Sequence, residues 1–538
     1  MLVACIAAVS IAELAASWSI VFDDAFISYR YAHNLARGHG LVWNLADGPT
    51  EGYTNLLWVL MLAPAAALGL DLLLVSRLVS VLAVLATSWL LGRASVVFLQ
   101  ASRSVALLVG AAYLCLNRPW FIAAHGMETT LFAALLLGAL LAAVSFLDDE
   151  SLSSLLRFAV LGSLALLMRP EASLLLGAFG LMLVIRRKTL RRGFGRAMLS
   201  LGISTVLPWV LIAAWRWWYF GSLLPNPFFI KGAQPALVRP MGLRSVMDYL
   251  QHVDGLLALA VVSALWPNRR LRPHYCDARI LALLVATAFA GFFLRIDTLQ
   301  DAGQRFMYPV TPLLLLVALP VLVPLLYHLL TWPVGLGRRL AVGIGIFATL
   351  IHGSPELAAR EFWQVASGTA VGGGQVHPGV AATEALVARK LARFPHIAET
   401  SLAFGDAGTL ADFTDSTFID LVGLNARFIA TQRDIGRLLA YLFDKRPTII
   451  IVPTRRDLSL ITFRHGPLGD WSTWTKHASC RWHEYGYVGT TFTLGAYDLS
   501  ILVRRDDRHA AELAAFLRRH VISGRARAFP LPVGELGE

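Results

Sequence analysis

The chain has 538 residues, of which 56% are hydrophobic and 15% are charged, and its formal net charge is +12. Soluble globular chains are about 45–50% apolar and about 25% charged, so this composition excludes an ordinary soluble enzyme. The Lys and Arg residues lie between apolar runs, which argues against nucleic-acid binding. It favours a membrane protein whose basic loops stay in the cytoplasm.

Apolar runs of roughly 15–22 residues, the length that crosses a hydrocarbon core, recur through the first two thirds of the chain. About eleven spans are predicted, at 1–21, 77–98, 104–118, 129–147, 153–169, 171–186, 197–220, 245–267, 279–296, 308–329 and 339–352. We therefore expect a transmembrane domain at 1–352 with a large first external loop at 22–76, a linker at 353–379, and a separate domain at 380–538.

The run at 55–70 is ambiguous because it contains Pro64 and only about 15 apolar positions, which also suits a re-entrant or interfacial segment. If this run does not span, the basic loops near 186–196 and 269–272 fall on one side of the membrane, which the positive-inside rule makes the cytoplasm. We favour this arrangement over the spanning one. It puts several polar loops and the C-terminal domain together on the external face.

The C-terminal region changes in composition after a glycine-rich stretch at 372–374. Helical patterns near 380–394 and 431–443 alternate with β-rich runs, which predicts a small α/β domain. The predicted strands are 402–404, 417–422, 448–452, 487–493 and 500–504.

Asp23 and Asp24 follow the first apolar run directly. Adjacent carboxylates at a membrane boundary repel each other and are poorly solvated, and both effects raise a pKa toward the range of a general base. The alternative is a cap at the start of a helix. Trp43, Tyr53 and Asn55 in the same loop suit a sugar ring, although the two aromatic residues equally suit an interfacial belt.

Other charged residues lie at the predicted external ends of spans. Glu128, beside His125, is a candidate for orienting an acceptor hydroxyl or holding a cation, or else is a favourable carboxylate at a helix start. Arg169, Lys231 and Arg305 are candidates for binding a phosphate. An ion pair between Arg169 and Glu171, or cationic side chains that reach the interface, would be the structural alternative.

Seven segments carry a resemblance to a known family, and they lie at 22–32, 125–130, 168–172, 224–231, 303–309, 404–408 and 419–425. Together they resemble the mycobacterial terminal arabinofuranosyltransferase family, whose members are polyprenyl-phosphate-dependent glycosyltransferases of the GT-C class. The resemblance implies a polytopic α-helical GT-C fold and a catalytic aspartate in the first external loop, at Asp23 or Asp24.

The predicted function is transfer of a sugar, arabinofuranose if the resemblance holds, from a polyprenyl-phosphate donor to a cell-envelope glycan or glycolipid, with inversion at the anomeric carbon. Asp23 or Asp24 would be the base, Arg305, Arg169 and Lys231 would bind the donor phosphate, and Glu128, His125, Tyr53, Trp43, Asn55 and Glu171 would contact acceptor or sugar. No cofactor is certain, and a divalent cation is compatible with the carboxylates. The predicted location is a bacterial inner membrane, with the active site and the C-terminal domain outside the cytoplasm. A lipid-linked substrate transporter or flippase, and a non-enzymatic membrane scaffold, are the alternatives.

Overall fold

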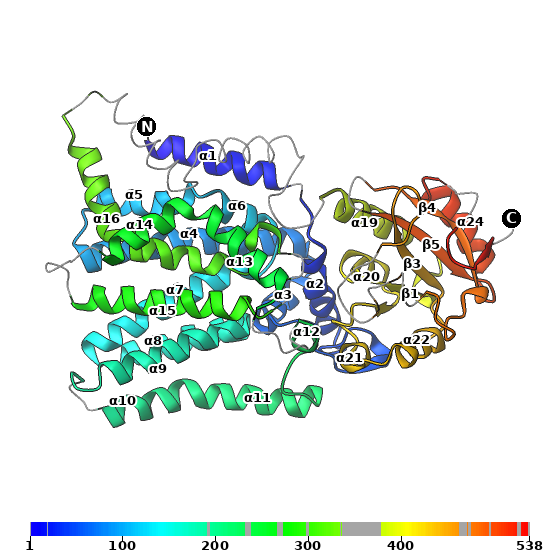
Figure 1. Ribbon diagram of the computed structural model, residues 1–538, viewed down its shortest axis with the longest axis horizontal. Coiled ribbons are helices and arrows are strands. Elements are labelled where there is room, and N and C mark those ends of the chain that lie inside the picture. The colour runs from blue at the N-terminus through cyan, green and yellow to red at the C-terminus, as the bar shows by residue number, and fades with distance from the viewer. Residues whose placement is uncertain are drawn as a thin grey trace. The chain divides into compact units, whose positions relative to one another are not determined.

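The computed structural model divides the chain into two compact units (Figure 1). The helical unit contains residues 1–19, 73–215 and 236–375, and the sheet unit contains residues 20–72, 216–235 and 376–538. The structure describes residues 2–18, 20–190, 194–231, 238–265, 273–296, 298, 301–333, 335, 378–461, 468, 471, 475–493, 497–524 and 529–535.

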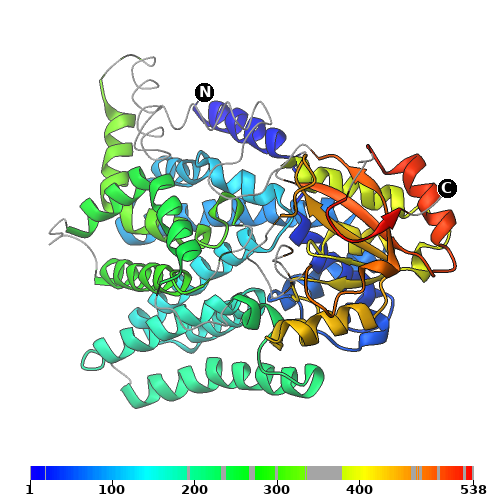
Figure 2. The same cartoon turned by 45° about the vertical axis from the view of Figure 1, so that its right-hand side comes forward.

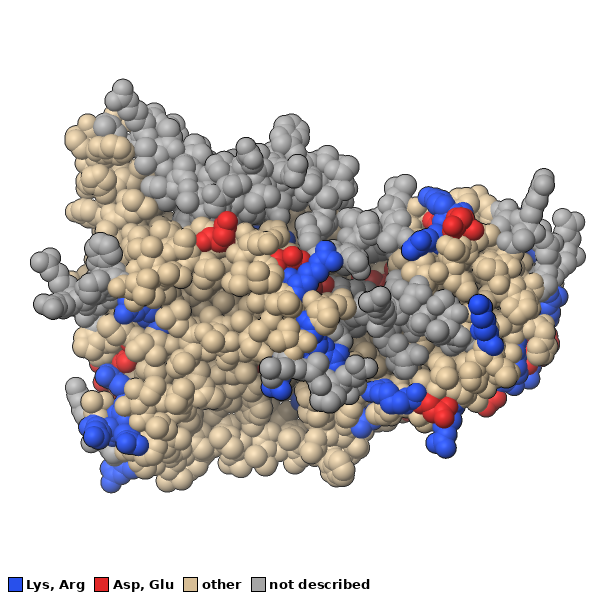
Figure 3. Space-filling view, in the orientation of Figure 1, with Lys and Arg blue, Asp and Glu red and all other residues tan. Residues whose placement is uncertain are grey.

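Four helices are long and apolar enough to cross a membrane, which makes the chain compatible with membrane insertion. They are α4 (Leu72–Leu99), α7 (Thr129–Asp149), α15 (Pro273–Phe293) and α16 (Thr311–Thr331). A bent pair, α5 (Arg103–Leu114) with α6 (Asn117–Ala124), makes a fifth if it counts as one span. The helix α7 is the most enclosed of the four, with 78% of its most apolar window buried. Among the described residues on the face drawn in Figure 3, few charged side chains interrupt the surface of the helical unit.

The remaining apolar runs form shorter helices. They are α1 (Leu2–Ser17), α8 (Leu152–Met168), α9 (Ser173–Ile185), α10 (Phe194–Leu201), α11 (Leu207–Phe220), α13 (Pro240–His252) and α14 (Asp254–Leu265). A π-helical turn at Gly202–Val206 joins α10 to α11. The predicted run at 245–267 is divided between α13 and α14, and the one at 339–352 and most of the predicted linker lie outside the described residues. Length and composition therefore identify four or five spans, while the predicted number of eleven stays a prediction.

The C-terminal part of the sheet unit contains a six-stranded sheet in the order β2-β1-β3-β5-β4-β6. Strands of this sheet are drawn as arrows in Figure 2. The strands are β1 (Ser401–Phe404), β2 (Thr417–Asp420), β3 (Ile449–Thr454), β4 (Tyr485–Thr491), β5 (Asp498–Arg504) and β6 (Gly534–Glu535). The first three are parallel, and β5 is antiparallel to both β3 and β4. The predicted α/β domain and its five predicted strands are confirmed, and β6 is an additional strand.

The inner strands of the sheet are buried on both faces because helices pack against it. The helix α22 (Ile435–Asp444) contributes Leu438, Leu442 and Phe443 to a core that also contains Ile450 and Leu502 from the strands. The helix α24 (Ala510–His520) packs against β4 and β5, and α19 (Pro378–Leu391) packs against the short helix α20 (Thr409–Thr414). The predicted helices near 380–394 and 431–443 correspond to α19 and α22.

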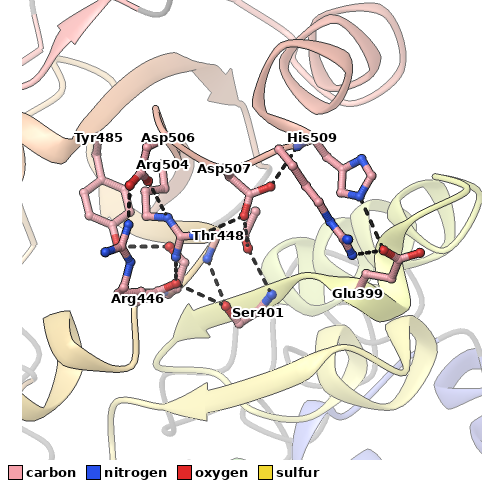
Figure 4. Close-up of polar contacts among 11 residues, drawn as sticks. Glu399, Ser401, Arg446, Thr448, Tyr485, Arg504, Asp506, Asp507 and His509 are labelled. Carbon is pink, nitrogen blue, oxygen red and sulfur yellow. Dashed lines mark hydrogen bonds and ion pairs between the residues drawn. The ribbon is translucent and has the colours of Figure 1, made fainter.

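Charged and hydroxyl side chains tie together the ends of three strands (Figure 4). Ser401, at the start of β1, exchanges hydrogen bonds with Thr448 just before β3, and the Thr448 hydroxyl donates to Asp507 at 2.9 Å. Arg504, at the end of β5, pairs with Asp507 at 3.0 Å. This network fixes the register at one end of the sheet.

The first loop belongs to the sheet unit. It forms α2 (Asp23–Ala36) and α3 (Leu56–Ala67), and α2 packs against α20. The side chain of Asn44 donates to the carbonyl of Phe418 at 3.0 Å and accepts from its N–H at 2.9 Å, which satisfies the outer edge of β2. The 12 residues of α3 cover about 18 Å, which is too short to cross a membrane and favours the non-spanning alternative for 55–70.

Candidate active site

Asp23 is the first residue of α2, and its carboxylate is clamped by the start of α20. One oxygen accepts the Gly408 N–H at 2.7 Å, and the other accepts the Thr409 N–H at 2.6 Å and the Thr409 hydroxyl at 2.9 Å. The residue is only 6% exposed. A side chain at position 408 would place its Cβ 1.9 Å from the Asp23 carbonyl oxygen, so glycine is required for this close approach.

Two further carboxylates lie beside Asp23. Asp406 follows β1, and Glu384 comes from α19. Both are joined by Tyr497, whose hydroxyl hydrogen-bonds to Asp406 and, at 3.1 Å, to Glu384. The charges of Asp406 and Asp23 act on each other and on Glu384 across this group. We call Asp23, Asp24, Glu384 and Asp406 the acidic cluster.

Burial makes the acidic cluster a poor place for several negative charges at once. Desolvation, reinforced by the charge of Asp406 and opposed by the hydrogen bond from Thr409, raises the pKa of Asp23 to about 7. Desolvation and the neighbouring carboxylates also raise the pKa of Glu384 well above its ordinary value, and desolvation raises the pKa of Asp406. The three buried members, Asp23, Glu384 and Asp406, therefore hold protons more strongly than exposed carboxyl groups do.

Asp24 differs from Asp23 in exposure. It is partly exposed, whereas Asp23 is buried with both oxygens engaged by Gly408 and Thr409. The alternative of a helix cap does not describe Asp23, because its carboxylate accepts hydrogen bonds from α20 rather than from its own helix. Of the two adjacent aspartates, Asp24 is the one with a surface to offer a substrate.

The other predicted residues of the first loop lie in the packed interior of the sheet unit. The Trp43 ring lies under the Arg30 guanidinium at 4.8 Å, and its N–H donates to the Phe418 carbonyl at 3.2 Å. This arrangement leaves the Trp43 ring no free face for a sugar or a lipid interface. Asn55 precedes α3 and is hydrogen-bonded to Ser28.

Two predicted ligands of the sheet unit come from different segments. Tyr53 is buried, with its ring 4.6 Å from that of Tyr31 in an edge-to-face arrangement. Lys231 is the last residue of the short helix α12 (Asn226–Lys231) and is partly exposed. Both belong to the same compact unit as the acidic cluster.

In the helical unit, Arg169 is buried between two carboxylates. Its guanidinium lies 3.2 Å from Glu171 and 3.6 Å from Glu128, and it faces the rings of Phe132 and Phe306. The ion pair between Arg169 and Glu171 that the sequence offered as an alternative is therefore present, and Glu128 extends it.

Arg305 faces the same Phe306 ring as Arg169 and lies near the start of α7. Its guanidinium contacts the Met127 sulfur at 2.7 Å and the Phe306 ring at 5.0 Å. His125 is buried, with its ring 4.5 Å from that of Phe121, and the positive charges of Arg305, Arg77 and Arg118 all act on it. Arginines thus gather around the turn that precedes α7.

Sequence reasoning missed several members of these groups. Glu384 and Tyr497 sit in ordinary helical and strand-flanking stretches with no local signal, and Asp406 lies in the 404–408 segment that carries the family resemblance. Arg77 lies inside an apolar run, where a charged side chain is costly and so signals a function or a specific partner. It donates to the Ala124 carbonyl at 2.7 Å.

One group among the described residues has three potential metal ligands close together, namely His396, Glu399 and His509. The two imidazole rings stack at 4.1 Å with planes only 12° apart, so their in-plane lone pairs do not converge on one ion. The Arg508 guanidinium also pairs with Glu399. We interpret this group, drawn in part in Figure 4, as a charged hydrogen-bond network at the surface.

Comparison with known proteins adds one match. Residues 379–502 match a family model described as "Domain of unknown function (DUF8728)". The matched stretch contains two members of the acidic cluster, Glu384 and Asp406, and also Tyr497, whose hydroxyl contacts both. No curated protein matches the chain.

Proposed function

We propose that this protein is a membrane glycosyltransferase that moves a sugar from a polyprenyl-phosphate donor to a cell-envelope glycan or glycolipid. The carrying observation is the pair of adjacent carboxylates in which Asp23 is locked and buried while Asp24 is partly exposed. Apolar helices long enough to span a bilayer suit a lipid-linked donor. The GT-C class and arabinofuranose are the finer proposals, and they rest on the sequence resemblance.

The sheet unit is assembled from three separate chain segments, and this arrangement supports a topology with eleven spans. Its three segments must share one side of a membrane because they fold together. The chain between them must then cross an even number of times. Six predicted runs separate residues 72 and 220, and four separate residues 235 and 376, so both numbers are even when the run at 55–70 does not span. With the basic loops in the cytoplasm, the sheet unit is external.

In the proposed reaction, Asp24 accepts the proton of an acceptor hydroxyl as its oxygen attacks the anomeric carbon. The new bond between that carbon and the acceptor oxygen forms while the bond to the phosphate oxygen breaks, and polyprenyl phosphate leaves with the electron pair. Attack from the side opposite the leaving group inverts the anomeric configuration. Asp23 acts as a positioning residue, since its clamp to Gly408 and Thr409 fixes the start of α2.

The leaving phosphate requires positive charge and hydrogen-bond donors. Following the sequence prediction, we assign this role to Arg169, Arg305 and Lys231. The start of α7 adds the partial positive charge of a long helix and two buried hydroxyls, those of Thr129 and Thr130. Neither hydroxyl has a hydrogen-bond partner among the described residues.

The test is turnover of lipid-linked donors by the purified chain and its Asp24→Asn variant. Loss of a general base typically lowers kcat by about 10²–10⁴-fold, and we expect a loss in that range with an unchanged melting temperature. Asp415→Asn is the matched control, because Asp415 is an exposed partner of Arg37, and it should retain full activity. A variant at position 24 that still transfers sugar at the wild-type rate would remove Asp24 from this role.

A further inference from the structure

A second polar group in the sheet unit lies where the first loop meets α12. The backbone N–H of Asn226 donates to the Glu51 carbonyl at 3.0 Å, which joins the two segments. The Gly52 N–H donates to the Tyr31 hydroxyl at 3.1 Å, and a Cβ at Gly52 would lie 1.8 Å from the side-chain oxygen of Asn425. The stretch from Glu51 to Tyr53 is therefore held in place from several directions.

The side chains of this group are buried with polar atoms left over. Glu51 and Tyr53 are each 4% exposed and Asn226 is 3% exposed. One oxygen of Glu51 pairs with Arg216 at 2.8 Å. The other oxygen, the Tyr53 hydroxyl and the Asn226 side-chain nitrogen find no hydrogen-bond partner among the residues that the structure describes.

Such atoms are costly, since each unsatisfied buried polar group destabilises a fold by about 1–3 kcal/mol. Native structures contain few of them, and three on adjoining residues point to a ligand that supplies the missing bonds. We call Glu51, Tyr53 and Asn226 the Glu51 cluster.

The chemistry of the Glu51 cluster narrows the ligand class. The carboxylate oxygen accepts, the amide nitrogen donates, and the phenol does both. Arg216 already balances the charge of Glu51, which disfavours a phosphate or a cation as the ligand. Tyr53 is close enough for the charges of Glu51 and Arg216 to act on it. A neutral molecule with several hydroxyl groups offers both the donors and the acceptors that these atoms lack.

We propose that Glu51, Tyr53 and Asn226 bind the hydroxyl groups of a sugar ring, and that Arg216 positions Glu51 for this contact. The inference rests on the proposed glycosyltransferase function and assigns its sugar contacts to residues that the acidic cluster does not include. The sugar is either the one carried by the donor or the terminal residue of the acceptor, and the two are separated by experiment.

The test uses the full chain in lipid nanodiscs with Tyr53→Phe and Asn226→Leu variants. A panel of polyprenyl-phosphate-linked sugars forms the donor arm, and synthetic oligosaccharide acceptors form the acceptor arm. Each variant should raise KM in one arm by about threefold to tenfold, the effect of one lost neutral hydrogen bond, and leave KM in the other arm unchanged. The arm that changes identifies the sugar.

A purely structural role for the Tyr53 hydroxyl predicts that Tyr53→Phe has a lower melting temperature. The sugar proposal predicts that the melting temperature stays the same or rises, because this substitution removes an unpartnered hydroxyl. Tyr485→Phe is the matched control, since the Tyr485 hydroxyl is buried but donates to the Pro447 carbonyl at 2.9 Å. This control should lower the melting temperature and change neither KM.

Failure of the inference is distinguishable from failure of the proposed function. If the wild type transfers sugar and both variants keep both KM values within about twofold, the sugar assignment is wrong while the enzyme assignment stands. If the wild type transfers nothing, the glycosyltransferase proposal fails. The Glu51 cluster is then decided by thermal stabilisation with a panel of methyl glycosides, which must stabilise the wild type and not Tyr53→Phe for the inference to survive.

Discussion

The acidic cluster predicts that the sheet unit loses stability as pH rises from 5 to 8. Burial raises the pKa of Asp23 from 3.8 to about 7, so between these values the folded state holds a proton that the unfolded state has released. Stability therefore falls as pH rises through this window and is level above it. The loss is complete by about pH 8.

The magnitude follows from the pKa of Asp23. Between pH 5 and the Asp23 pKa of about 7, the free energy of unfolding falls by about 3 kcal/mol, at 1.36 kcal/mol for each pH unit. For a unit of this size, this lowers the melting temperature by about 6–12 °C. Glu51 and Asp420, whose pKa values burial raises to about 7 and about 6, act in the same direction, as does His33 through its hydrogen bond to Asp412.

Pulse proteolysis of the C-terminal segment at pH 5, 6, 7 and 8 measures this dependence in the full chain. Asp23→Asn cannot ionise, so it should remove about 3 kcal/mol of the change, while His33→Gln measures the share of the histidine. If the hydrogen bonds from Gly408 and Thr409 outweighed burial, Asp23 would be ionised throughout. The wild type and Asp23→Asn would then show the same pH dependence, which would refute the reasoning.

Two substitutions test the packing around the Glu51 cluster. Gly52→Ala should destabilise the sheet unit by about 1–3 kcal/mol, because the new Cβ collides with the Asn425 side chain and the Leu424 carbonyl. The midpoint of chemical denaturation measures this loss, and Gly162→Ala, whose Cβ meets nothing within 4 Å, is the control that should not collide. Arg216→Met should lower stability by about 3 kcal/mol, since it leaves the Glu51 carboxylate buried without its partner, and adding Glu51→Gln should recover part of the loss in a chemical denaturation series. If the double variant is no more stable than Arg216→Met alone, the ion-pair argument is wrong.

The elements of this fold were predictable where their signal is local. Continuous apolar runs identified α4, α7, α15 and α16, and alternating strands between helical stretches identified the sheet. The shorter helices were predicted in place but not in length, because hydropathy does not record the turn between α13 and α14 or the π-helical turn after α10.

The candidate site was predictable only in part. Two adjacent aspartates after an apolar run are visible in the sequence, but their partners are not, since Asp23 and Gly408 are 385 positions apart. Trp43 was predicted to contact a sugar because an aromatic ring near carboxylates and amides suits a sugar ring, with an interfacial belt as the alternative. Its ring instead packs under Arg30, a contact that depends on tertiary structure.

The interleaving of the two units has a consequence for biosynthesis. At roughly 5–20 residues per second, the ribosome needs on the order of 20–80 seconds to reach Thr409 after finishing Asp23. Until then the Asp23 carboxylate lacks its partners Gly408 and Thr409, and the amino-terminal segment must wait for the last third of the polypeptide. A nascent chain in this condition is a natural client for a chaperone or a protease.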